Sequence, residues 1–78
     1  MNKQKLIREL SKIDVQTVQS VTLRTIGLIS VFGKMIIDIE FTNETKTSIE
    51  IISPVPTDVV KDWLTENNLL DKTLMYEF

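Results

Sequence analysis

The sequence contains no cysteine and no histidine. Without cysteine the chain has no disulfide framework and no thiolate metal site. Without histidine it lacks the commonest general base and the commonest metal ligand in proteins. The serine and threonine hydroxyls therefore have no imidazole to activate them as nucleophiles. These absences predict a protein that is not an enzyme and that holds neither a metal nor a cofactor.

Glycine and proline are also scarce, with two of each in the chain. Gly27 and Gly33 do not form a loop that could cradle a phosphate. The most apolar stretch, residues 26–37, is interrupted by Lys34 and falls short of the roughly 20 residues that a membrane span needs. No apolar segment follows the basic start of the chain, so we expect no signal peptide. The expected location is the cytoplasm of a bacterial host.

The composition is that of one small globular domain. Hydrophobic residues make up 42% of the chain and charged residues 26%, close to the average for globular proteins. A chain of 78 residues buries a limited share of its surface on folding. We therefore expect a single domain, residues 1–78, of modest stability.

The net charge is −2, but the two signs are unevenly distributed. Residues 1–34 carry six basic and two acidic residues, whereas residues 35–78 carry three basic and nine acidic ones. A dedicated nucleic-acid binder usually has a net basic domain, so direct nucleic-acid binding is not expected. The polarity predicts instead that a basic first helix lies beside an acidic last helix.

The first half of the chain predicts a helix followed by a long strand. Residues 3–13 read as a helix whose apolar residues form one stripe. That stripe consists of Leu6, Ile7, Leu10 and Ile13. Residues 15–32 are rich in Val, Thr and Ile, which favours a strand. Their apolar residues change parity along the strand, which predicts a β-bulge or a break near Arg24–Thr25.

The second half predicts two more strands and a second helix. The expected strands are 35–42 and 46–53, with turns at Phe32–Lys34 and Asn43–Thr45. Thr57 is the predicted N-cap of a helix that ends at Asn67 or Asn68. Its buried face holds Val59, Val60, Trp63 and Leu64. Residues 73–78 alternate in character and form either a short final strand or a docked tail.

This order predicts an α+β fold. An N-terminal helix is followed by a three-stranded antiparallel meander, and a C-terminal helix packs on the same face of the sheet.

The opposite, outer face of the predicted sheet carries the candidate site. Core packing requires the apolar residues of the second and third strands to share one face, which we predict to place Ile39 opposite Ile49 and Ile37 opposite Ile51. In that register the outer face sets Asp38 against Glu50, Glu40 against Ser48 and Ile36 against Ile52. Like charges directly opposite each other are destabilising, and nothing in local folding requires them.

An acidic cluster beside an apolar patch is typical of a face that binds a partner. The candidate binding residues are Asp38, Glu40, Glu50, Ile36 and Ile52. Two carboxylates are too few ligands for a metal site. In the alternative interpretation the C-terminal tail covers Ile36 and Ile52, and Arg24 or a lysine neutralises the acids.

One family resemblance is carried mainly by the N-terminal segment. That segment contains Met1-Asn2, Leu6-Ile7-Arg8-Glu9-Leu10, Asp14 and Thr17-Val18, and the later elements Ile36-Ile37, Asn43-Glu44 and Val59-Val60 follow in similar order. The N-terminal segment resembles the opening of small phage-encoded anti-CRISPR proteins that inhibit the type II CRISPR effector nuclease. The resemblance implies a helix, three antiparallel strands and C-terminal helices. It also implies an acidic decoy that occupies the site where the nuclease reads its DNA motif. This chain is only mildly acidic and lacks the acid-rich late stretch, so no inhibitory residue is carried over.

The sequence thus predicts a small non-enzymatic binding protein, encoded by a phage or mobile element. It would inhibit a host macromolecule, such as a CRISPR effector nuclease, by occupying a surface. The expected partner is a protein, such as a host nucleoprotein complex, and not a membrane. The alternative is a homo-oligomeric structural or regulatory domain that uses the outer sheet face for self-association.

Overall fold

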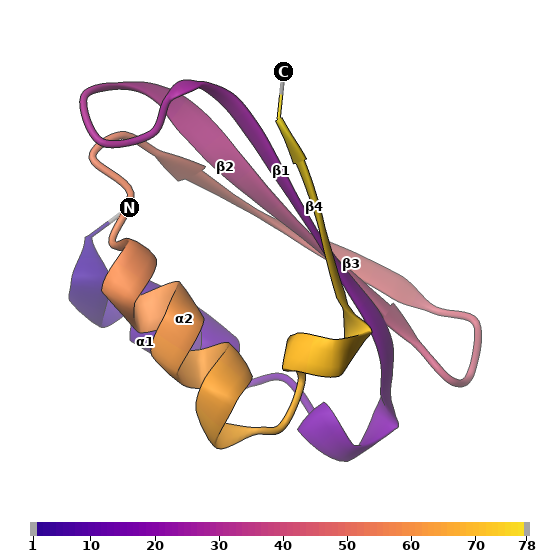
Figure 1. Ribbon diagram of the computed structural model, residues 1–78. Helices are drawn as coiled ribbons and strands as arrows, with labels where there is room; N and C mark the ends of the chain where they lie inside the picture. Colours follow the sequence, from indigo (N-terminus) through magenta and orange to yellow (C-terminus); the bar gives the residue numbers. More distant parts are fainter. Residues whose placement is uncertain (1, 78) are drawn as a thin grey trace.

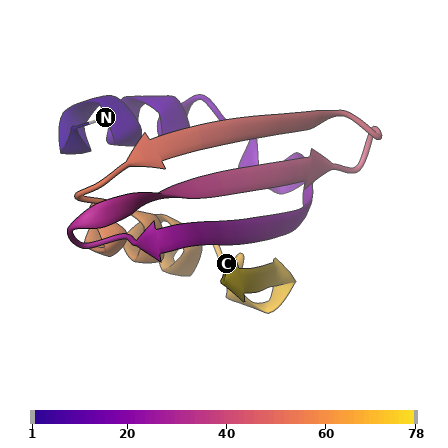
Figure 2. The ribbon, with the colours of Figure 1, turned by 90° about the horizontal axis from the view of Figure 1, so that it is seen from above.

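The chain folds into four strands and two α-helices, which confirms the predicted α+β class (Figure 1). The computed structural model describes the backbone of residues 2–77 and the side chains of residues 2–75. The strands form one sheet in the order β3-β2-β1-β4. Both α-helices cover the same face of this sheet, as predicted (Figure 1). The other face carries no helix (Figure 2).

Helix α1, Lys3–Ser11, begins where Asn2 caps it. The Asn2 side chain accepts a hydrogen bond from the Lys5 backbone N–H at 2.8 Å, which satisfies one of the free donors of the first turn. Leu6 and Leu10, four residues apart, are buried against the sheet. Ile7 is exposed, so its predicted place in the buried stripe was wrong. The helix is two residues shorter than predicted.

Strand β1, Val18–Leu28, follows the short 3₁₀ helix η1, Val15–Thr17. The bulge predicted near Arg24–Thr25 is absent from the strand's pairing, which runs unbroken from Ser20 to Leu28. Thr25, which is 8% exposed, takes the inward position. Its burial keeps the alternation regular and leaves Ile26 on the outer face. The irregularity lies instead between Val18 and Ser20.

Strand β2, Phe32–Phe41, begins earlier than predicted, because the turn lies at residues 29–31 and not at 32–34. Gly27 and Gly33 stand directly opposite each other, one before and one after this turn. Gly27 has a φ of +73°, and a Cβ on Gly33 would overlap the Ile26 carbonyl oxygen. Both glycines therefore serve the close approach of two backbones, and neither lies in the turn itself.

Strand β3, Lys46–Ile52, pairs with β2 in a register that differs by two residues from the predicted one. Ile37 faces Ile49, and Met35 faces Ile51. The turn sets this register. Thr45 accepts the Phe41 N–H at 2.9 Å through its carbonyl and donates its own N–H to the Asn43 side chain, while Glu44 adopts a positive φ. A shift of two residues preserves parity, so the inward-facing residues remain inward.

Helix α2, Thr57–Glu66, packs on the sheet through Val60, Trp63 and Leu64, which are buried as predicted. The N-cap position belongs to Pro56, with no side-chain capping bond, and Thr57 is the first helical residue, so the predicted cap was wrong. The helix ends at Glu66, next to the predicted end at Asn67 or Asn68, and Asn68 follows it in the left-handed conformation with a φ of 56°. Neither α-helix in residues 2–77 has the length and apolar character needed to cross a membrane.

The C-terminal segment forms a strand. After a second 3₁₀ helix, η2 (Leu70–Lys72), strand β4 (Thr73–Glu77) pairs parallel with β1, from Val21 opposite Thr73 to Thr25 opposite Glu77. The predicted segment extended to Phe78, which lies outside the described residues. Because β4 extends the sheet at the edge opposite β3, it does not cover Ile36 and Ile52, so the part of the alternative interpretation that placed the C-terminal tail over them was wrong.

Candidate functional site

The outer sheet face comprises the side chains of the four strands that point away from the helices, and Figure 2 shows the sheet from this side. All five predicted binding residues lie on it, because each is one residue removed from a buried position on its strand. The charged members of this face are Arg24, Lys34 and Lys46 together with Asp38, Glu40 and Glu50.

The predicted opposition of Asp38 and Glu50 was wrong. In the observed register Asp38 faces Ser48, and Glu50 faces Ile36. The Ser48 hydroxyl donates to one Asp38 carboxylate oxygen at 2.6 Å, and the Arg24 Nε donates to the other at 2.7 Å. Asp38 is therefore held by two donors within the fold, and Arg24 neutralises it as the alternative interpretation expected.

These contacts lower the pKa of Asp38 below its ordinary value. The largest cause is the hydrogen bond from Ser48, and the bond and charge of Arg24 add to it, while partial burial acts in the opposite direction. The carboxylate is consequently a structural anion at neutral pH. It is not a group poised to exchange protons.

Each of the other two acids on this face stands beside a lysine. Glu50 pairs with Lys34 at 3.4 Å, and Glu40 stands directly opposite Lys46. Glu40 therefore does not face Ser48, and Ile36 does not face Ile52, as the predicted register had them. Each of the three acids has one of the three basic residues as a neighbour on an adjacent strand, so the face is charge-balanced. An uncompensated acidic cluster, as predicted from the sequence, is not present among the described residues.

Replacing Asp38 with asparagine is expected to lower the free energy of unfolding by about 1 kcal/mol near neutral pH, because two charge-assisted hydrogen bonds are weakened. The folded protein holds the Asp38 pKa below that of the unfolded chain. This stabilisation is therefore present above the unfolded pKa of about 3.9 and is lost as the pH falls through the folded pKa. Urea denaturation of both proteins at neutral and at strongly acidic pH measures the difference, which should shrink in acid.

The matched control for this experiment is Glu50→Gln. Glu50 is 52% exposed and its partner is 3.4 Å away, whereas Asp38 is 32% exposed with its ion-pair partner at 2.7 Å. We expect the control to change stability less than Asp38→Asn does. A loss that is equal in the two variants, or that persists unchanged in acid, would contradict the assigned role of the Asp38 charge.

Apolar side chains surround this balanced set of charges. Ile26, Ile52 and Leu74 are exposed on β1, β3 and β4, and Ile36 lies half-buried between Arg24 and Glu50. Leu74 belongs to this face because its neighbours Thr73 and Met75 point to the helix side. The face therefore combines a balanced polar centre with an exposed apolar margin.

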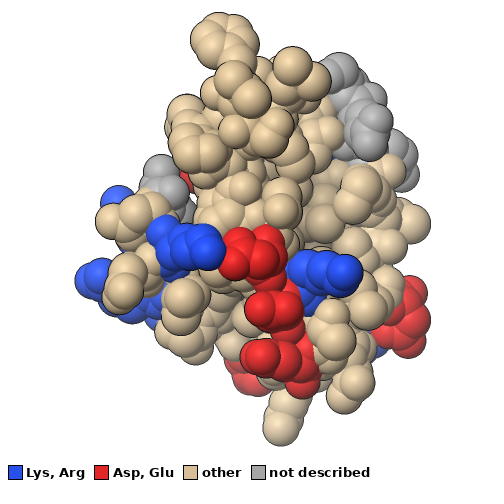
Figure 3. Space-filling model, turned by 60° about the vertical axis from the view of Figure 1, so that its left-hand side comes forward, with Lys and Arg blue, Asp and Glu red and all other residues tan. Residues whose placement is uncertain are grey.

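The charges of the helices meet in one ion pair. Lys3 of α1 contacts Asp58 of α2 at 2.8 Å, and this contact lowers the Asp58 pKa. Asp58, Asp62 and Glu66 recur every four residues along α2. Figure 3 shows a file of acidic side chains on this side of the molecule, with basic side chains on both flanks. The predicted neutralisation between the helices is thus present at the start of α2.

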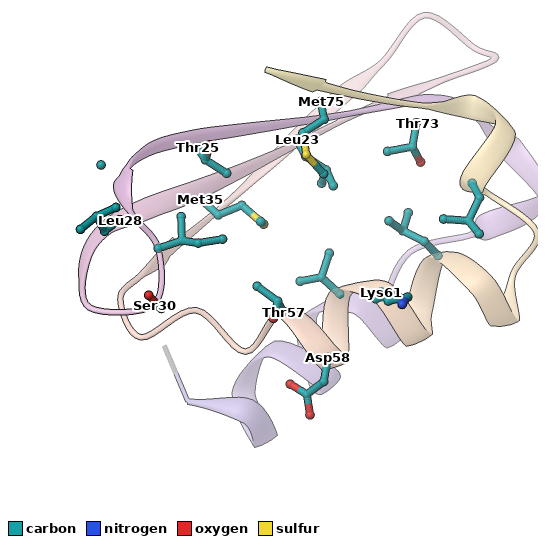
Figure 4. A pocket seen from close by; sticks show the side chains of 15 residues that line it. Leu23, Thr25, Leu28, Ser30, Met35, Thr57, Asp58, Lys61, Thr73 and Met75 are labelled. Atoms are coloured by element: carbon teal, nitrogen blue, oxygen red, sulfur yellow. The ribbon is translucent and has the colours of Figure 1, made fainter. Parts of the chain in front are cut away.

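A second surface, which the sequence did not indicate, is an apolar groove between α2 and the sheet (Figure 4). Its volume is about 770 Å³. Buried residues form its floor, and exposed Leu28, Leu70 and Met75 form its rim. The floor consists of Leu23, Met35, Val60 and Leu64. The groove depends on β4 lying parallel to β1, and periodicity within residues 73–77 carries no information about which strand they join.

Among the described residues, no three acidic side chains gather closely enough to hold a metal ion. Comparison of the chain with protein-family models, with curated proteins and with solved structures finds no match.

Proposed function

We propose that this chain is a non-catalytic binding protein that acts by occupying a surface on a host protein or nucleoprotein. The observation that supports it is the outer sheet face, where exposed Ile26, Ile52 and Leu74 frame a balanced network of charges and no described element covers them. Water-exposed apolar side chains around satisfied polar groups suit protein recognition, in which apolar contact supplies affinity and charge supplies register.

The binding residues on this face are Ile36, Ile52, Asp38, Glu40 and Glu50. The two isoleucines contribute apolar contact. The carboxylates contribute orientation, since each already stands near a basic or hydroxyl group and need not be neutralised by the partner. This role differs from that of the acidic cluster expected from the sequence, because a compensated carboxylate contributes little long-range steering.

The sharpest form of the proposal is inhibition of a type II CRISPR effector nuclease in a bacterial host by a phage- or mobile-element-encoded protein. It rests on the resemblance of the N-terminal segment and on the order of elements. The charge-balanced outer face argues against mimicry of a DNA phosphate backbone. Inhibition would therefore proceed by covering a protein surface.

Ile52→Glu tests the proposal, with Met75→Glu as its matched control. Both residues are on edge strands and similarly exposed, at 57% and 62%, but they lie on opposite faces of the sheet. Guide-loaded type II effector nuclease is mixed with each purified protein, and cleavage of target DNA is measured. We expect the unmodified chain and Met75→Glu to inhibit, and Ile52→Glu to lose at least about tenfold in potency, because it places a charge where an apolar side chain supplies contact.

Unimpaired cleavage in the presence of the unmodified chain would overturn the nuclease form of the proposal. The general form is then tested by capturing proteins from a bacterial lysate on each of the three immobilised chains. A protein that is retained by the unmodified chain and by Met75→Glu, but not by Ile52→Glu, would support it. Capture that is absent, or the same on all three chains, would contradict it.

A further inference from the structure

Strand β3 forms one edge of the sheet, and no described strand pairs with its outer side. Its pairing with β2 is continuous from Lys46 to Ile52, so it contains no bulge, and it contains no proline. Natural proteins commonly protect an edge strand by a bulge, a proline, a covering segment, inward-pointing charges or exposed charged side chains such as lysine. Here the charged residues are Lys46 and Glu50, and both lie on the outer sheet face.

The backbone groups that point outward from this edge can be assigned from the bonds at its two ends. The Thr45 carbonyl accepts the Phe41 N–H at 2.9 Å, and the Ser53 N–H donates to the Gly33 carbonyl at 3.0 Å. The direction of the backbone N–H and C=O groups alternates along a strand, so the odd-numbered residues between Thr45 and Ser53 also bond to β2. Lys46, Ser48 and Glu50 therefore direct their N–H and C=O groups away from the sheet.

The charges of this edge are self-complementary in one antiparallel register. If Ser48 of one copy lies opposite Ser48 of a second copy, Lys46 of each copy stands directly opposite Glu50 of the other. A register centred on Glu50 or on Lys46 would oppose like charges. A register centred on Ile49 would set Lys46 against an isoleucine. Opposite charges across an antiparallel pair stabilise it, and like charges destabilise it.

We propose that β3 pairs with β3 of a second copy of this chain, about a two-fold axis that is perpendicular to the sheet and passes between the two copies of Ser48. The contact is isologous, as in most homodimers, and joins two sheets into one. All helices then lie on one face of the joined sheet, and the outer sheet faces of both copies lie together on the other. Lys46 stands opposite Glu40 of β2, but among the described residues it makes no ion pair of its own, so it can also contact Glu50 of the second copy.

This dimer does not depend on the proposed function and differs from self-association through the outer sheet face, which it leaves open. It is tested without any partner, by sedimentation equilibrium of the full chain from micromolar to near-millimolar concentration. We expect a concentration-dependent mass that rises from one copy to two. Lys46→Glu alone and Glu50→Lys alone should each weaken the dimer by about tenfold or more, because two cross-strand pairs change from opposite to like charge.

Two rescue experiments fix the register. An equimolar mixture of the two single variants should dimerise again. The Lys46→Glu chain carries an acid at both positions 46 and 50 and the Glu50→Lys chain carries a base at both, so every cross-strand pair joins opposite charges. The double exchange Lys46→Glu with Glu50→Lys should also restore dimerisation, since the opposite charges have merely changed places. Lys34→Gln is the control, because it removes the intrachain partner of Glu50 without changing the charge of the β3 edge. This control should dimerise as the unmodified chain does.

A monomer at every concentration would overturn the proposal. So would a dimer that the single variants leave unchanged, since the edge would then not form the contact. Failure of both rescues in proteins whose circular dichroism shows the native fold would refute the register centred on Ser48. If Ile52→Glu lost the dimer while Lys46→Glu and Glu50→Lys dimerised as the unmodified chain does, self-association would lie on the outer sheet face instead.

Discussion

Replacement of Trp63 with alanine is expected to lower the free energy of unfolding by about 3–5 kcal/mol. Trp63 is 9% exposed and belongs to the cluster that joins α2 to the sheet. A domain of this size has a total stability of roughly 4–12 kcal/mol, so the loss is a large fraction of the whole. Urea denaturation followed by circular dichroism measures it, because the substitution removes the fluorescent reporter.

The control for Trp63→Ala is Ile7→Ala. Ile7 is also an apolar helical residue, but it is exposed on α1. Alanine favours a helix at such a position, so we expect a change within about 0.5 kcal/mol. If the Trp63→Ala protein unfolded at nearly the same urea concentration as the unmodified chain, Trp63 would not be packed in the core as described.

Replacement of Ile37 with alanine is expected to cost about 2–5 kcal/mol, and Ile37→Val about 0.5–1.5 kcal/mol. Ile37 is 0% exposed and lies at the centre of β2, between Leu23 of β1 and Ile49 of β3. Removing its side chain leaves a cavity in the middle of the sheet, where close packing allows little collapse. The same urea titration measures the graded series.

The neighbouring residue provides the comparison for Ile37. Ile36 is half-buried and points to the outer sheet face, so Ile36→Ala should cost clearly less than Ile37→Ala. Equal losses at the two positions would imply that the assigned faces of β2 are wrong. Because a one-residue slip exchanges the two faces of a strand, this pair of substitutions checks the orientation of the sheet directly.

The faces of the elements could be predicted from the sequence, because they depend on periods of two and 3.6 residues. Ile37, Ile39, Ile49 and Ile51 point inward as predicted, and so does Trp63. The pairing of β2 with β3 could not be predicted, since it depends on the conformation of the turn. There the Asn43 side chain and the positive φ of Glu44 close the loop.

The candidate site was affected by this same limit. Its residues lie on the predicted face, yet a two-residue change of register replaced the opposition of two acids with contacts from Ser48 and Arg24 to Asp38. Thr25 illustrates a related difficulty. The pattern of apolar residues placed a bulge or a break beside it, whereas its burial keeps β1 regular. The place of β4 was beyond reach, because its partner lies far away in the chain.

That distance has a consequence for the order in which the molecule assembles. Helix α1 and the β1–β3 meander join segments close in sequence, whereas β4 meets β1 across roughly fifty residues, so its loop closure costs more conformational entropy. The wall that Met75 and Thr73 contribute to the apolar groove is therefore completed late in folding. We therefore expect any detachment of this short parallel strand to remove one wall of the groove.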